Sequence, residues 1–383
     1  MPPNGYKIAE CLETTALTAR AKGLDLKSMS AANYNRYAMC VKKEMNDFQQ
    51  QQLSAWLPHL NAGTVFPTFF LMASCMITLG VCQLYISAQV QELQIKYTHC
   101  YPITGGKSCA QTLEDNPDSE GCKCVLPFML DVPFEANVYI YYALNNYYQS
   151  LQNYIYSQNE AQLDGSFTPT YPCNSETQSL YNAFASKIID GKEVPIVPCG
   201  AIGNSLFNDT IRLVRSGQGV PLIYTGISWP TDQVKFNNPK GIPLNTAYEN
   251  YTNPVYWRKN IWDLDPNNSD NNGMKNEALI VWYRTAAFPE FRKFYAKVDH
   301  KIGTTYEKSL PKGSYFLEID YNYPVRMFGG TKSVVISNTS WIGGKNSFLG
   351  FAYISTGKVG AHHKYTIFHD KYIHHKENIN EIF

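Results

Sequence analysis

Disulfide formation is the first chemistry that the sequence indicates. Six cysteines follow a long apolar segment, and none occurs after the last of them. Six cysteines allow 15 pairings. Cys122 and Cys124 are separated by one residue, a spacing at which two cysteines rarely reach each other, so each is expected to pair elsewhere, most simply with Cys100 or Cys109. That leaves Cys173 for Cys199. Because disulfides persist only in oxidising compartments, we expect this half of the chain outside the cytosol.

Sequons for N-glycosylation occur in the same half of the chain. A single sequon often arises by chance, but several sequons together with six cysteines predict a glycosylated lumenal or extracellular domain. The alternative is a cytosolic protein with accidental sequons and metal-binding thiols. The four acceptors are Asn208, Asn250, Asn267 and Asn338.

A run of acidic and amide residues from Asp263 to Gly273 resembles a calcium loop. An EF-hand loop needs glycine at its sixth place and a carboxylate at its twelfth. Neither requirement is met when the loop is counted from Asp263 or from Asp265. We therefore expect a series of Asx turns that leads to the turn at Gly273, and no metal site.

No catalytic pattern stands out elsewhere. The chain lacks a Gly-x-Ser-x-Gly elbow, a phosphate-binding Gly-rich loop with lysine, and a His-Glu-x-x-His pair. The carboxylates Glu318 and Asp320 leave glycoside hydrolysis open as a remote alternative. Lysines interrupt a histidine cluster near the C-terminus, which is expected to be a solvated tail. We therefore predict that the chain is not an enzyme and has no catalytic, metal-binding or cofactor-binding residue.

One segment predicts a transmembrane helix. No charged residue occurs between Phe48 and Gln91, and Val65 to Ala88 is mostly apolar, which is long enough to cross the hydrocarbon. Trp56 and Tyr85 flank it at interface depth. Seven basic residues precede the segment and only Lys96 is near its other end, which places the N-terminus in the cytosol.

These signals predict four regions. They are a cytosolic tail (1–60, with a short helix around 33–43), a transmembrane helix (64–88), a lumenal or extracellular glycosylated domain (91–345), and a degenerate second membrane segment with a basic, His-rich tail (346–383). Lys and Arg (33) nearly balance Asp and Glu (32), so no net field favours a nucleic-acid partner.

The large domain is predicted to be an antiparallel, β-sandwich-like α+β domain with a few short helices. Periodicity predicts strands at 137–144 and 278–283 and a pair of strands at 315–321 and 333–337. It also predicts helices at 145–158 and 289–298.

Four sequence blocks resemble the cell cycle control protein 50 family, also called the transmembrane protein 30 family. The resemblance runs from about Gln51 to Tyr353, and the C paralogue is the form most like this chain. The blocks are PIVPCGAIGNSLFNDT at 195–210, DNNG at 270–273 through IVWYRTAA at 280–287 with FRK at 291–293, DYNYPV at 320–325 and SWIGGKN at 340–346.

The resemblance implies a non-catalytic β-subunit of a type IV P-type ATPase, a phospholipid flippase. Such subunits support folding, exit from the endoplasmic reticulum and phospholipid translocation, at the endoplasmic reticulum, Golgi and plasma membrane. The family has two membrane helices around a glycosylated lumenal domain. It also implies nested disulfides, Cys100–Cys124 and Cys109–Cys122, with Cys173–Cys199 separate.

The chain departs from the family pattern in its second membrane segment. The uncharged stretch from Asn346 to Gly357 has only twelve residues, and Lys358 follows it. Twelve residues cannot span hydrocarbon as a helix, and each mid-bilayer lysine costs about 3 kcal/mol. We therefore expect one firm span and a half-inserted or lumenal remnant at 347–357. This opens an alternative function, a single-pass glycoprotein ectodomain that has lost its flippase partner.

Overall fold

The computed structural model describes residues 62–116, 121–135, 137–166 and 184–362. The chain divides into two units, of which the larger, Ala73–His362, contains the β-rich domain. The helix expected around 33–43, the flanking Trp56, Cys173 and the tail from residue 363 lie outside the described residues.

The segment predicted to be transmembrane forms helix α3, Ala62–Gln89. Within the described residues, one helix is long and apolar enough to cross a membrane, over Val65–Gln89. Pro67 is the sixth residue of this helix, so its missing N–H removes one i→i−4 hydrogen bond of the helix. Tyr85 is 68% exposed near the other end, as expected of an interfacial aromatic side chain.

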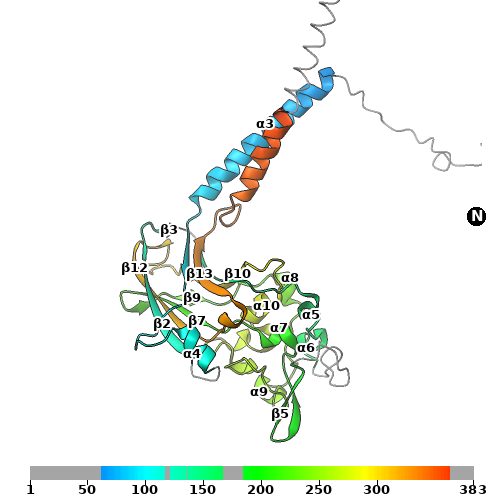
Figure 1. Ribbon diagram of the computed structural model, residues 1–383, viewed down its shortest axis with the longest axis vertical. Helices are drawn as coiled ribbons and strands as arrows, with labels where there is room; N and C mark the ends of the chain where they lie inside the picture. The colour runs from blue at the N-terminus through cyan, green and yellow to red at the C-terminus, as the bar shows by residue number, and fades with distance from the viewer. Residues whose placement is uncertain (1–61, 117–120, 136, 167–183, 363–383) are drawn as a thin grey trace, which may run out of the picture. The chain divides into compact units, whose positions relative to one another are not determined.

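Two antiparallel sheets contain most of the strands of the domain (Figure 1), which confirms the predicted antiparallel, β-rich architecture. Buried residues of both sheets, such as Leu144 and Leu317, belong to one hydrophobic core. The first sheet has the order β1 (Glu92–Lys96), β13 (Thr331–Asn338), β4 (Val138–Asn145), β10 (Phe291–Val298) and β9 (Leu222–Ile223). The second has the order β2 (Cys122–Leu130), β12 (Gly313–Tyr321), β7 (Thr210–Arg215) and β8 (Gln218–Gly219).

Short elements connect these sheets. Two small ladders pair β3 (Phe134–Glu135) with β11 (Ser309–Leu310) and β5 (Ser186–Ile189) with β6 (Lys192–Pro195). The helices are α4 (Cys109–Asp115), α5 (Gln152–Ile155), α6 (Glu160–Leu163), α7 (Gly200–Asn204), α8 (Pro230–Gln233), α9 (Leu244–Ala247) and α10 (Glu277–Tyr283). Single 3₁₀ turns occur at Ile261–Asp263, Ser269–Asn271, Gly273–Lys275 and Arg326–Phe328.

The strand prediction at 137–144 is confirmed by β4, but two neighbouring assignments are wrong in opposite directions. The segment 278–283, predicted as a strand, is helix α10, and 289–298, predicted as a helix, contains strand β10. Helix α10 begins where Asn276 Oδ1 accepts a hydrogen bond from Leu279 N. Strand β10 pairs with β4 along six residue pairs. The periodicity of a short apolar run is compatible with a helix or with a strand. Here the helix cap at Asn276 and the pairing of β10 with β4 determine which of the two forms.

The other two predictions fail for similar reasons. The helix predicted at 145–158 is reduced to the four residues of α5. Asn146 adopts a left-handed conformation (φ 61°) and its Nδ2 donates to Phe328 O, so the chain turns away directly after β4. Strands are present at 315–321 and 333–337, but they belong to different sheets and do not pair with each other.

The aromatic residues meet around Trp282 of α10. Its indole is fully buried and Nε1 donates to Ile202 O at 3.0 Å. Tyr142 of β4 stacks on Phe207 with ring centroids 3.9 Å apart. The buried ammonium of Lys293 donates to the carbonyls of Trp282 and Arg284, and so closes the C-terminal end of α10. Burial lowers the pKa of Lys293, an effect to which the charge of Arg284 adds.

The segment 347–357, expected to be a half-inserted or lumenal remnant, belongs largely to a helix over 348–362. This C-terminal helix lies alongside α3 (Figure 1). Asn346 N donates to Ser87 Oγ at 3.0 Å, which holds the start of the C-terminal helix to the last turn of α3.

Glu277, in the first turn of α10, holds the segment 226–228 through four hydrogen bonds. Its carboxylate accepts from the backbone N–H groups of Gly226, Ile227 and Ser228 at 2.8–2.9 Å and from Ser228 Oγ at 2.9 Å. Partial burial raises the pKa of Glu277, but these hydrogen bonds outweigh that effect and the net pKa is lowered.

We predict that Glu277→Gln destabilises the full chain by about 2 kcal/mol near neutral pH, because an amide cannot accept all four hydrogen bonds. A lowered folded-state pKa gives a contribution that is complete above the unfolded pKa of about 4.3 and is lost as pH falls through the folded value. The difference in thermal stability between wild type and variant should therefore shrink at acidic pH. Near-UV circular dichroism in detergent micelles measures it.

Glu290→Gln is the matched control, because Glu290 is exposed and no hydrogen bond to its carboxylate is found in the described part of the chain. A difference for Glu277→Gln that stays constant from pH 7 to pH 3 would contradict the prediction.

Candidate functional site

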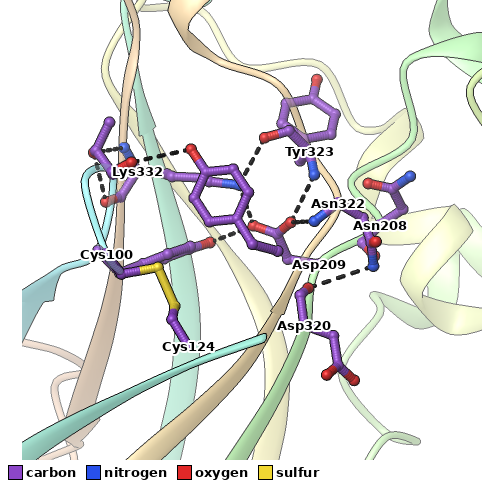
Figure 2. Close-up of polar contacts among 11 residues, drawn as sticks. Cys100, Cys124, Asn208, Asp209, Asp320, Asn322, Tyr323 and Lys332 are labelled. Carbon is purple, nitrogen blue, oxygen red and sulfur yellow. Dashed lines mark hydrogen bonds and ion pairs between the residues drawn. A yellow bond between two sulfur atoms is a disulfide. The ribbon is translucent and has the colours of Figure 1, made fainter. Parts of the chain in front are cut away.

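A fully buried ion pair joins the two sheets. Lys332, the second residue of β13, places Nζ 2.6 Å from Oδ2 of Asp209, which directly precedes β7. Both side chains are 0% exposed. Figure 2 shows the two side chains meeting among residues from both sheets. Such a pair is tolerated only where the remaining polar atoms of both groups have partners.

The carboxylate of Asp209 has four hydrogen-bond partners. Oδ2 accepts from Lys332 Nζ and from the hydroxyl of Tyr97 at 2.8 Å. Oδ1 accepts from the backbone N–H groups of Asn322 at 2.6 Å and Tyr323 at 2.7 Å. Asp209 thereby fixes the chain that leaves β12 and the residue that follows β1.

The ammonium of Lys332 is satisfied in the same way. Besides Asp209, Nζ donates to Tyr323 O at 2.6 Å, and it lies 3.2 Å from the centroid of the Tyr321 ring. Burial lowers the pKa of Lys332 to about 8, and the Asp209 carboxylate offsets part of that effect. The 2.6 Å contact to the carboxylate is that of a charge-assisted hydrogen bond.

Two disulfides lie beside this ion pair. The structure links Cys100 with Cys124 and Cys109 with Cys122, the nested pairs that the family resemblance implies. Cys100 N donates to Tyr97 O, so the first disulfide lies close in the chain to the residue that binds Asp209. Figure 2 shows the Cys100–Cys124 disulfide near Asp209 and Lys332. The sulfurs of Cys100, Cys109 and Cys124 lie within 4.8 Å of one another because the two disulfides are neighbours, and oxidised sulfur is not a thiolate ligand.

Only one cysteine of the third expected disulfide belongs to the described residues. Cys199 is buried and disulfide-bonded at the start of α7, and its expected partner, Cys173, lies outside the described residues.

The four sequon asparagines differ in exposure. Asn250 and Asn267 are exposed. Asn208 is half-buried beside a cavity of about 410 Å³, and its Nδ2 donates to Tyr256 O at 3.0 Å. Asn338 is only 9% exposed, its Nδ2 donates to Glu135 O, and its Oδ1 accepts from Gln91 N.

The Asp- and Asn-rich segment folds as predicted. Asp265 Oδ1 accepts from Asn267 N, and Asn268 Oδ1 accepts from Asp270 N, which are two successive Asx turns. Asp265 Oδ2 accepts from Asn271 Nδ2, so this carboxylate is engaged within the loop. The Asx-turn interpretation is confirmed. Of the C-terminal histidines, only His362 belongs to the described residues.

The arrangement around Lys332 organises structure and leaves no reactive atom exposed. Both charged groups are buried, so a substrate cannot reach them from solvent. The carboxylates Glu318 and Asp320, which lie on one strand, surround Arg212: its guanidinium lies 3.2 Å from Asp320 and 3.9 Å from Glu318. They do not face each other across a cleft in the manner of a glycosidase pair.

Sequence reasoning missed the ion pair. Asp209 lies inside a sequon, which drew attention to its neighbour Asn208 instead. The available signal was Lys332, a lysine directly before the apolar strand predicted at 333–337. A charged side chain in a strand that is buried on both faces must have a partner of opposite charge or a set of hydrogen bonds. The sequence does not show which residue that partner is.

Comparison with known proteins identifies the family. The profile of the LEM3 (ligand-effect modulator 3) family / CDC50 family matches residues 83–377, which include both sheets, both described disulfides and the C-terminal helix. The chain belongs to the CDC50 family.

Curated relatives agree with this membership. The chain is 41% identical to cell cycle control protein 50A of Bos taurus, covering 82% of this chain and 84% of that protein. It is 40% identical to cell cycle control protein 50B of Homo sapiens (82% and 88%) and 36% identical to cell cycle control protein 50C of Mus musculus (84% and 91%). These identities do not single out the C paralogue.

We predict that Lys332→Met destabilises this CDC50-family chain by about 3–5 kcal/mol, because it leaves the Asp209 carboxylate buried without a counter-charge. The double variant Lys332→Met/Asp209→Asn should lose less than the sum of the two single changes, since the groups are directly coupled. Thermal unfolding of the full chain in detergent micelles measures both effects.

Lys96→Met is the control, because Lys96 is exposed on the neighbouring strand β1. A loss below about 1 kcal/mol for Lys332→Met would mean that the buried pair does not hold the sheets together.

Proposed function

We propose that this chain is a non-catalytic accessory β-subunit of a type IV P-type ATPase phospholipid flippase. It would assist the folding of the catalytic subunit, its exit from the endoplasmic reticulum and phospholipid translocation. The observation that carries the proposal is the match of the family profile over residues 83–377. A domain whose central charged groups are buried suits a partner-binding role better than catalysis.

The proposed topology places the N-terminus in the cytosol and the domain 91–345 in the lumen or outside the cell. Basic residues concentrated before α3 support this orientation. The disulfides Cys100–Cys124 and Cys109–Cys122 support an oxidising environment for the domain. The proposed locations are the endoplasmic reticulum, Golgi and plasma membrane, with a heterodimeric ATPase partner.

A second candidate function is a single-pass glycoprotein ectodomain that has lost its flippase partner. Lys358 supports this alternative, because it follows only twelve uncharged residues in the second membrane segment. Recovery of an ATPase with the chain separates the two functions.

The proposed lumenal location predicts glycans on the exposed sequons. Replacement of Asn250 or Asn267 by Gln should increase the gel mobility of the chain by one glycan each. Replacement of the half-buried Asn208 should do the same, because the hydrogen bond that its side chain donates, to Tyr256 O, is exposed. Asn338, which its sequon led us to expect as an acceptor, is the exception: Asn338→Gln should give no shift, because its side chain is buried and bonded to Glu135 and Gln91. Endoglycosidase treatment of wild type is the reference, and a chain without any glycan would contradict the proposed location.

The accessory role predicts a stable complex. When the tagged chain is co-expressed with a panel of type IV P-type ATPase catalytic subunits, at least one should be recovered with it, and the glycans of the chain should mature. A chain with the disulfide pair Cys109 and Cys122 replaced by serine should show immature glycans and reduced recovery, because the domain loses about 3 kcal/mol of stabilisation. Failure of the wild-type chain to recover any catalytic subunit would favour the second candidate.

A further inference from the structure

The C-terminal helix packs against α3 through glycines. A Cβ atom on Gly357 would lie 2.6 Å from Ile77 Cγ1, and one on Gly350 would lie 2.6 Å from Leu84 Cγ. Both distances are too short for a real side chain, so the backbones approach as closely as small-residue contacts between membrane helices do. The two contacts also give the register: the helices are antiparallel, with Gly357 level with Ile77.

This register places Lys358 near the middle of the span. Ile77 is twelve residues from each end of the candidate span Val65–Gln89, which is about 18 Å of helix on either side. Lys358 follows Gly357 directly and is exposed, on a face away from the glycine contact. Ser355, three residues earlier, is exposed as well and lies on the same face of the helix.

No carboxylate of the two helices can neutralise this lysine. The chain has no charged residue between Phe48 and Gln91, and the segment 347–362 contains neither Asp nor Glu. No hydrogen bond or ion pair to Lys358 is found in the part of the chain that the structure describes. Ionisable residues in membrane segments seldom face lipid and usually pair with another group.

We infer that Lys358 pairs with a carboxylate in a membrane segment of the flippase catalytic subunit, near the middle of the bilayer. This inference rests on the proposed function, because it presupposes that a flippase catalytic subunit binds the helix face that carries Ser355 and Lys358. Lipid phosphates do not fit as the counter-charge, because they lie at the edges of a hydrocarbon layer about 30 Å thick. Only another protein segment can hold a carboxylate at that depth.

The charge can be tested without weakening membrane insertion. Lys358→Met keeps the length of the side chain and makes the helix more apolar, so insertion should improve. A loss of partner binding in this variant could therefore not be explained by poorer membrane insertion. We expect recovery of the co-expressed catalytic subunit to fall about tenfold for Lys358→Met, and Lys358→Arg to retain it.

Val359→Met is the matched control, because Val359 is the adjacent residue, is 68% exposed and carries no charge. It should recover the catalytic subunit as wild type does. A reciprocal test combines Lys358→Glu with lysine replacements of the Asp and Glu residues in the catalytic subunit's membrane segments. One combination should restore the recovery that Lys358→Glu alone abolishes.

The outcomes separate the two proposals. Wild-type recovery by Lys358→Met, or an equal loss with Val359→Met, would overturn the charge pair while the accessory role stands. Failure of the wild-type chain to recover any catalytic subunit would instead reject the accessory role, and the charge pair with it. Gel mobility without reductant would show in each case whether the disulfides have formed.

Discussion

The ion pair between Lys332 and Asp209 constrains most of the domain. Two charges without contact to water are stable only when every remaining donor and acceptor is matched. Asp209 takes its hydrogen bonds from a residue after β1 and from backbone groups after β12, and Lys332 lies on β13. The positions of three strands therefore depend on one pair of side chains. The nested disulfides begin three residues beyond Tyr97 and hold the adjoining segment to β2.

The same requirement for matched polar groups shapes the surroundings of Trp282. The buried Lys293 has no carboxylate partner among the described residues, and instead binds the free carbonyls at the end of α10. Glu277, at the other end of α10, accepts from three consecutive backbone N–H groups. A seven-residue helix, apolar apart from Glu277, is thus held at one end by Glu277 and at the other by Lys293. Packing around Trp282 stabilises it further.

The contact between α3 and the C-terminal helix depends on small residues and not on matched polar groups. Close approach of backbones then decides which helices associate, and glycines at 350 and 357 allow it here. Neither α3 nor the described C-terminal helix contains a carboxylate that could pair with Lys358. In a membrane, an unmatched charge indicates a missing partner more strongly than an exposed apolar surface does. The short apolar stretch at 346–357 is therefore compatible with binding to a flippase catalytic subunit.

The sequence by itself determined features that depend on local composition. These are the span at 65–88, the separation of cysteines and sequons from it, the strand at 137–144, the Asx turns after Asp263 and the resemblance to the family. Each depends on length, charge or motif spacing, which are written in consecutive residues. The antiparallel, β-rich character also follows, because the chain lacks the alternation of strands and helices that a parallel sheet needs.

Only the tertiary structure decided what depends on distant residues. The apolar segment 278–283 is a helix because Asn276 caps it and Lys293 binds its last carbonyls, and 291–298 is a strand because β4 offers a matching edge. Lys332 and Asp209 are 123 residues apart in the chain. Hydrogen-bond partners, burial and helix register arise from contacts between segments that are far apart in the chain. They cannot be predicted from a pattern of neighbouring residues.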